Sequence, residues 1–179
     1  VYGIEYHTAA DFLVDGLTMS FSASTDDDTA STSTYGMDSH VAFGGTYVTS
    51  AGDSTVTLGF GFSESEGAKT GDQFTNDEGG YHVGLSAVTG DLTVAVGVAG
   101  GSSIEKTNTL QNEDGEYAAA GAKYVSGDLT FNVGFASGTS KDSATAGTKD
   151  TTEDSEDTVS ASISYAVASG VTAYLGYSD

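Results

Sequence analysis

Apolar and small residues alternate along most of the chain. In residues 92–98, every even position holds Leu or Val and every odd position holds Thr, Ala or Gly. A period of two is that of a β-strand, whereas a helix repeats every 3.6 residues. The pattern predicts an all-β protein of ten strands, near residues 1–6, 17–24, 41–49, 55–63, 81–88, 92–99, 117–125, 129–136, 158–167 and 171–178.

Similar segments recur at a long interval. Residues 90–98 read GDLTVAVGV and residues 127–135 read GDLTFNVGF. Glycines open comparable segments at intervals of 36, 38, 37 and 43 residues, at Gly16, Gly52, Gly90, Gly127 and Gly170. A repeat of this length suits the blades of a propeller, the turns of a solenoid or the successive hairpins of a barrel.

The connections between the predicted strands alternate in length, which favours the barrel. Four are short and rich in Gly, Asp and Ser, at residues 50–54, 89–91, 126–128 and 168–170. Four are long and polar, at residues 25–40, 64–80, 100–116 and 137–157. Alternate connections of an up-and-down sheet lie at the same end, so we expect a barrel with one plain rim and one elaborate rim.

The non-apolar strand face indicates a membrane protein. It consists mostly of Gly, Ala, Ser and Thr, while nearly all charge lies in the predicted loops. A soluble protein exposes more charge than this. We therefore predict a transmembrane antiparallel up-and-down β-barrel whose apolar face meets lipid and whose small polar face meets a lumen. Lipid tolerates no open sheet edge, so such a sheet must close.

The few larger polar side chains within the strands are candidates for the pore lining. They lie opposite the apolar positions, at Glu5, His82, Lys123 and Asn132. Tyrosines near the strand ends suggest interfacial girdles. Tyr117 shares the parity of Lys123, which suggests a bulge in that strand.

Charge excludes some partners. The 26 acidic residues and five lysines give a formal net charge of −21, which excludes nucleic acid as a partner. The absence of Cys excludes disulfides and cysteine-ligated metals. Three histidines stand in no recognisable catalytic motif, so no enzymatic activity, catalytic residue or cofactor is predicted. A barrel-wall enzyme using His82 and a neighbouring acid is the alternative to a simple lining histidine.

Two acidic runs are candidate calcium ligands, because Ca²⁺ prefers several hard oxygen ligands. A solvated charge run is the simpler interpretation, and divalent ions that bridge the loops, to one another or to lipopolysaccharide phosphates, are the functional one. The residues are Asp26, Asp27, Asp28, Glu153, Asp154, Glu156 and Asp157.

The ordered series of segments resembles the general porins of Gram-negative outer membranes, especially the alphaproteobacterial, Rhodobacter-like group. The segments are DGLTMSFS at 15–22, GDLT at 90–93 and 127–130, and VTAYLGY at 171–177. The resemblance implies a homotrimer of sixteen-stranded barrels that passes small hydrophilic solutes and ions. It also implies that residues 1–179 are one barrel domain, incomplete at both ends, which spans about the sixth to the fifteenth strand. The family's constriction loop and closing strand have no counterpart here, so the narrowest point of the pore is not defined by this sequence.

Two functions follow from these observations. The first is a water-filled outer-membrane channel for passive diffusion, weakly cation-preferring because of the acidic loops. The second is a secreted or surface-attached acidic β-rich module that binds calcium or a partner.

Overall fold

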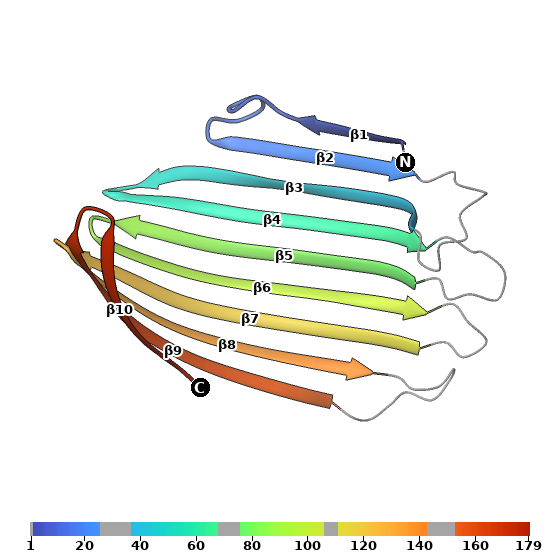
Figure 1. Ribbon diagram of the computed structural model, residues 1–179. Coiled ribbons are helices and arrows are strands. Elements are labelled where there is room, and N and C mark those ends of the chain that lie inside the picture. Colours follow the sequence, from blue (N-terminus) through green and yellow to red (C-terminus); the bar gives the residue numbers. More distant parts are fainter. Residues whose placement is uncertain (1, 26–36, 68–75, 106–110, 143–152) are drawn as a thin grey trace.

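The described chain forms one antiparallel sheet in which the ten strands follow one another in chain order (Figure 1). The computed structural model describes residues 2–25, 37–67, 76–105, 111–142 and 153–179. The predicted all-β, up-and-down arrangement is confirmed. The strands are β1 (Tyr2–His7), β2 (Leu17–Thr25), β3 (Met37–Ala51), β4 (Ser54–Gly67), β5 (Asn76–Thr89), β6 (Leu92–Glu105), β7 (Gln111–Ser126), β8 (Leu129–Asp142), β9 (Glu153–Ala168) and β10 (Val171–Ser178).

The plain rim is built from two-residue turns. Between β3 and β4, between β5 and β6, and between β7 and β8, the turn is a Gly followed by an Asp. These glycines have positive φ angles of 63°, 55° and 58°, at Gly52, Gly90 and Gly127. Glycine adopts such angles without strain, and a glycine at the first central position matches the turns of tight hairpins. The recurring glycine is therefore the residue that reverses the chain.

The strands are longer than the alternation of apolar residues predicts. β4, β6 and β8 have 14 residues each, and β7 and β9 have 16. The ladder continues into segments that the sequence assigns to long loops, so the predicted loop boundaries are wrong. Backbone hydrogen bonding does not require apolar side chains, and a strand needs only about 9–11 residues to cross a bilayer. The extra residues extend the wall on the long-loop side.

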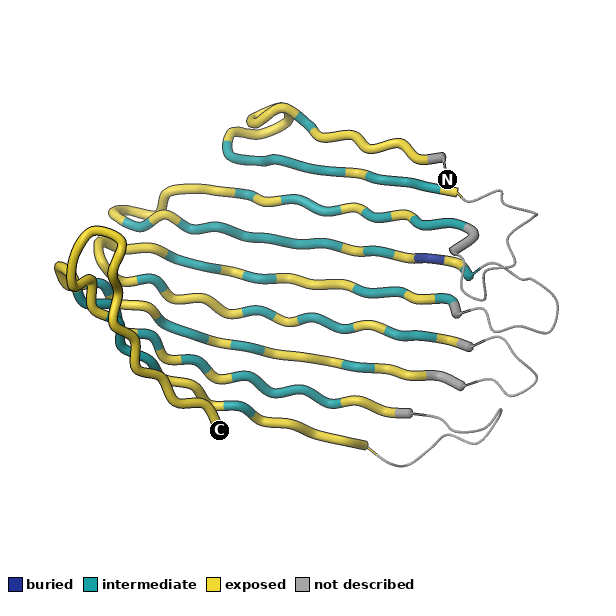
Figure 2. Tube along the Cα trace, viewed as in Figure 1, coloured by how far each residue is buried: buried dark blue, intermediate teal, exposed yellow. Residues whose placement is uncertain are grey.

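The sheet has no hydrophobic core. Among the described residues no hydrophobic side chain is buried, and the one buried polar residue is Ser65. In Figure 2 intermediate and exposed residues alternate along the strands. Even mid-strand residues such as Leu85 and Val96 are 46% and 55% exposed. A soluble antiparallel sheet buries one face against a second layer. The apolar side chains of this sheet must be covered by something other than the described chain.

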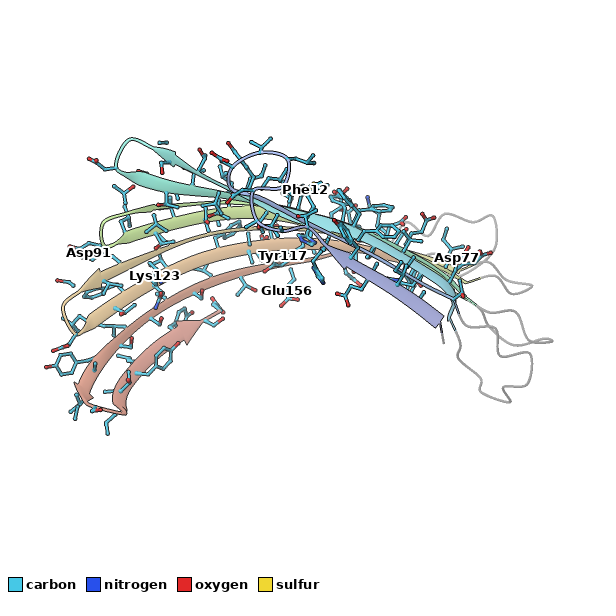
Figure 3. All side chains as sticks on the ribbon, turned by 90° about the horizontal axis from the view of Figure 1, so that it is seen from above. Phe12, Asp77, Asp91, Tyr117, Lys123 and Glu156 are labelled. Atoms are coloured by element: carbon cyan, nitrogen blue, oxygen red, sulfur yellow. The ribbon has the colours of Figure 1, made fainter. Side chains whose placement is uncertain are left out.

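The sheet is twisted and curved (Figure 3). β1 pairs with β2 and β10 pairs with β9, and the described strands at the two edges do not pair with each other. The ten strands therefore form a curved wall with a concave and a convex side. Within the described residues no helix has the length and apolar character needed to cross a membrane.

Candidate pore lining

Strand register assigns every side chain to one of two faces, because directly paired residues of a ladder lie on the same face. One such row crosses nine strands and holds small or acidic residues: Glu5, Ser22, Ala42, Ser63, Gly80, Gly101, Gly115, Ser140 and Asp154. A row of the opposite face is apolar throughout: Leu17, Tyr47, Leu58, Leu85, Val96, Ala120, Phe135 and Val159. The sheet thus has a polar face of small side chains and an apolar face of large ones.

The polar face is the concave one. Figure 3 shows Tyr117 and Glu156 on the inner side of the curve. Tyr117 on β7 and Glu156 on β9 both pair with Gly138 on β8, so the three residues lie in one row. The large apolar side chains therefore project from the convex side. The concave side is the inner face of the sheet, and the convex side is its outer face.

All four side chains predicted to line the lumen lie on the inner face, and of these only Lys123 and Asn132 are direct neighbours. Glu5 pairs with Ser22, and His82 pairs with Gly61 in the adjacent row. Lys123 pairs with Asn132 between β7 and β8, nearer the tight turns. The structure therefore brings Lys123 and Asn132 together and keeps them apart from Glu5 and His82.

Glu5 contacts a second polar side chain of β1, that of His7. His7 Nε2 lies 2.8 Å from Glu5 Oε1, and the side chains of His7 and Glu5 are 62% and 68% exposed. The two residues stand two apart on β1 and so share the inner face. The same period-two rule that selected Glu5 identifies His7 when it is applied along the strand.

The His82 ring covers Gly61. A Cβ atom at position 61 would lie 2.3 Å from Cε1 of His82, so the ring occupies the space that a side chain on β4 would fill. Around this pair the inner face forms an open hollow of about 700 Å³, which Glu5 and His7 also line. Within the described part of the chain, no carboxylate forms a hydrogen bond with His82. The barrel-wall enzyme that uses His82 stays an alternative interpretation.

Asn132, the neighbour of Lys123, is joined to β9 by a hydrogen bond. Asn132 Nδ2 donates to Ser162 Oγ at 3.1 Å, and this contact is partly buried. Lys123 lies next to Asn132 in the same row, with Thr93 on its other side. The row places one positive charge among neutral polar groups on the inner face.

The predicted bulge at Tyr117 is wrong. β7 pairs with β6 and with β8 without a register shift, so Tyr117 lies on the inner face with Lys123. Its bulk is accommodated by the facing glycine, since a Cβ at Gly138 would lie 3.3 Å from Cδ2 of Tyr117. Tyr117 therefore lies on the inner face and not in a girdle on the outer face.

The acidic run from Glu153 to Asp157 lies in a strand and not in a loop. Alternation along β9 puts Asp154 and Glu156 on the inner face and Glu153 and Asp157 on the outer face. On the outer face, Glu153 Oε2 is 3.2 Å from Lys141 Nζ. This placement divides the run between two sides of the sheet.

Calcium binding therefore stays a prediction. Asp26, Asp27 and Asp28 lie outside the described residues. Among the residues that the structure does describe, no group of three or more His, Asp or Glu side chains is arranged to hold a metal ion. Asp154 and Glu156 instead add negative charge to the inner face near the long loops, which the sequence analysis missed because it assigned them to a loop.

Comparison with known proteins agrees with this geometry. No curated protein matches the chain significantly. The profile of a family described as Gram-negative porin matches residues 4–179, nearly the whole sequence. The family is one of channels, and the convex apolar face and concave polar face are those of a membrane barrel wall. On the extent of this match and the arrangement of the two faces, the chain belongs to the Gram-negative porin family.

Proposed function

We propose that the chain forms the wall of a water-filled channel through which small hydrophilic solutes and ions diffuse passively. The observation that carries the proposal is the division between the two faces. The outer face carries large apolar side chains that the described chain leaves exposed, such as Val94 and Phe131, which are 43% and 41% exposed. The inner face carries small polar residues, as a lumen filled with water requires.

We propose further that the channel weakly prefers cations. The inner face carries acidic side chains near the long loops, including Asp154 and Glu156, while Lys123 lies nearer the turns. The whole chain has a net charge of −21. Negative charge at a pore mouth concentrates cations, but its reach falls from about 10 Å at 0.1 M salt to about 3 Å at 1 M. The preference should therefore weaken as salt increases.

Several features of the assembly are proposals that rest on the family. They are insertion in the outer membrane, closure into a sixteen-stranded barrel, association into a homotrimer and membership of the Rhodobacter-like group. The outer-face acids near the long loops, such as Glu64 and Asp157, suit contact with lipopolysaccharide through divalent ions. Removal of divalent cations by a chelator, followed by measurement of trimer stability, would test that contact.

Conductance in a planar bilayer tests the channel. We expect the complete protein, extracted in detergent, to give stepwise conductance. Reversal potentials under a salt gradient should show cation preference at low ionic strength and little at high ionic strength. A protein that dissolves in plain buffer as a monomer and gives no conductance would overturn the proposal in favour of a soluble acidic binding module. Anion preference at low salt would leave the channel intact and overturn its proposed selectivity.

A further inference from the structure

The connection between β1 and β2 differs from every other described connection at the same rim. The other four described connections have two residues each, whereas residues 8–16 form a nine-residue loop. Its sequence is TAADFLVDG, with three consecutive apolar residues at its centre. A two-residue turn would suffice to join neighbouring antiparallel strands. The extra length therefore needs its own physical explanation.

The loop is held by a set of hydrogen bonds. Thr8 N donates to Met19 O at 2.9 Å, and Met19 N donates to the Thr8 hydroxyl oxygen at 2.9 Å. Leu17 N donates to Val14 O at 3.0 Å, which closes a turn at the end of the loop. The backbone of residues 8–17 is thus tied to β2 at both ends by hydrogen bonds of the chain itself.

Asp11 reverses the chain inside the loop. Its φ angle is +64°, a left-handed conformation that Asp tolerates better than most residues. Gly16 N donates to the Asp11 carboxylate, and Asp11 N donates to Leu17 O at 3.2 Å. The carboxylate is therefore used within the loop.

Gly16 fastens the loop to β3. Its carbonyl oxygen accepts a hydrogen bond from Val48 N at 2.8 Å, beyond the last ladder pair between Leu17 and Tyr47. A Cβ at Gly16 would lie 1.9 Å from Val48 O, and the φ angle is +82°, so no other residue fits without a shift of the backbone. The loop consequently lies beside the turn end of β3, next to the apolar row of the outer face.

The fastened loop presents three apolar side chains that touch little of the described chain. Phe12, Leu13 and Val14 are 60%, 65% and 54% exposed. Figure 3 shows Phe12 on the opposite side of the sheet from Tyr117 and Glu156, which is the outer side. The tip is therefore continuous with the apolar outer face, at the level where Tyr47 stands. Tyrosine is typical of the boundary between hydrocarbon and water.

We propose that Phe12, Leu13 and Val14 form a lipid anchor, which inserts into the interfacial region of the bilayer at the turn rim. The proposal goes beyond channel function and rests on the membrane placement of the outer face. Lipid fits the tip better than a second copy of the chain, because three side chains are far fewer than a stable protein interface of roughly 1,000 Å² needs. A preformed apolar tip adds lipid contact without an ordering cost.

Residues 1–179 contain no Trp, so a single Trp introduced here reports on one position once any Trp elsewhere in the complete protein has been replaced by Phe. The test compares Phe12→Trp with two controls in the complete protein, refolded into phosphatidylcholine vesicles. Val94→Trp reports the mid-wall outer face, and Asp91→Trp reports a two-residue turn at the same rim. The probes are brominated phosphatidylcholines, which quench Trp in contact with acyl chains, and acrylamide, which quenches Trp in water.

We expect brominated lipid to quench Phe12→Trp to an extent comparable with Val94→Trp, and acrylamide to quench it less than Asp91→Trp. Quenching of Phe12→Trp by acrylamide to the level of Asp91→Trp would overturn the anchor. Protection from both quenchers, lost when the oligomer dissociates, would also overturn it and assign the tip to a second copy. Failure of brominated lipid to quench Val94→Trp would overturn the membrane placement itself, which distinguishes that failure from failure of the anchor alone.

Discussion

The two faces of the same strands differ in side-chain size more than in exposure. On β6, Val94 and Val98 of the outer face are 43% and 49% exposed, whereas on the inner face Ala95 is exposed and Thr93 and Gly97 are half-buried. Neither face of this strand is buried by the described chain, so exposure separates the faces only in part. What distinguishes them is that one carries bulky apolar groups and the other carries Gly, Ala, Ser and Thr.

This comparison shows how a sheet can be stable without a core. In a soluble sheet, apolar side chains are removed from water by packing on a second layer. Here lipid would cover the outer face, and water would cover the inner one. Stability then depends on the match between each face and its solvent. Substitutions on the two faces test that match, and a charge on the outer face should have the largest effect.

Introduction of charge should separate the faces most clearly. Val94→Lys places an ammonium group on the outer face and should cost about 2–4 kcal/mol of folding free energy near the bilayer midplane. Ala95→Lys, on the inner face beside Ser86 and Gly121, should fold nearly as well as the original chain. Urea-induced unfolding of the complete protein in lipid vesicles measures both. Equal stabilities for the two variants would show that the faces are assigned incorrectly.

Loss of a hydrogen bond on the inner face should have a smaller effect. Asn132→Ala removes the 3.1 Å contact with Ser162 Oγ and should lower the free energy of unfolding by about 1 kcal/mol. Ser162→Ala should cost a similar amount. If the two groups act through this bond, the double variant should lose less than the sum of the single losses. Strict additivity would indicate that the contact contributes nothing to stability.

Two glycines on the inner face of β4 should respond differently to the same change. Gly59 has no atom within 4 Å of an added Cβ, so Gly59→Ala should stabilise the strand by about 0.5–1 kcal/mol. Gly61→Ala should not stabilise the strand, because the added Cβ forces His82 out of its present rotamer at a cost of about 0.5–1.5 kcal/mol.

The double variant Gly61→Ala with His82→Ala is the control for this pair. It should recover the stability of Gly59→Ala when compared with His82→Ala alone, as measured by the same unfolding assay. No recovery would mean that the ring of His82 is not what restricts position 61.

The smallest effect on stability should come from charge reversal on the inner face. Lys123→Glu changes the net charge from −21 to −23 and should leave unfolding unchanged. It should strengthen the cation preference at low salt, because the charge lies within the pore and not at its mouth. Lys141→Glu, which changes the net charge equally on the outer face, is the matched control. Equal shifts of reversal potential for the two variants would contradict the inner placement of Lys123.

Part of the candidate site could be predicted from the sequence. The period of two placed Glu5, His82, Lys123 and Asn132 on one face, and the structure agrees. The same period holds through β7. The bulge predicted at Tyr117 is wrong because an aromatic residue can also lie on the face that carries the small residues. A tyrosine can face the inner side because Gly138 leaves space beneath it, and that pairing depends on strand register.

The polar strand ends could not be predicted, because the signal used to find strands was apolar alternation. Asp154 and Glu156 lie in β9 through backbone pairing with β8, which the residue types do not reveal. The β1–β2 loop was likewise not recognised. Its conformation depends on hydrogen bonds from Met19 and Val48, which lie beyond the loop along the chain.

The sequence by itself determined the strand count, the order of up and down strands and the two-faced character of the sheet, because these follow from local alternation and from turn glycines. Only the tertiary structure decided which face is concave, how far the strands extend and which residues meet across them. Those properties arise from register and curvature, which depend on pairing between strands and not on the residue types within any one strand. A local pattern of apolar and small residues is the same whichever way the sheet bends.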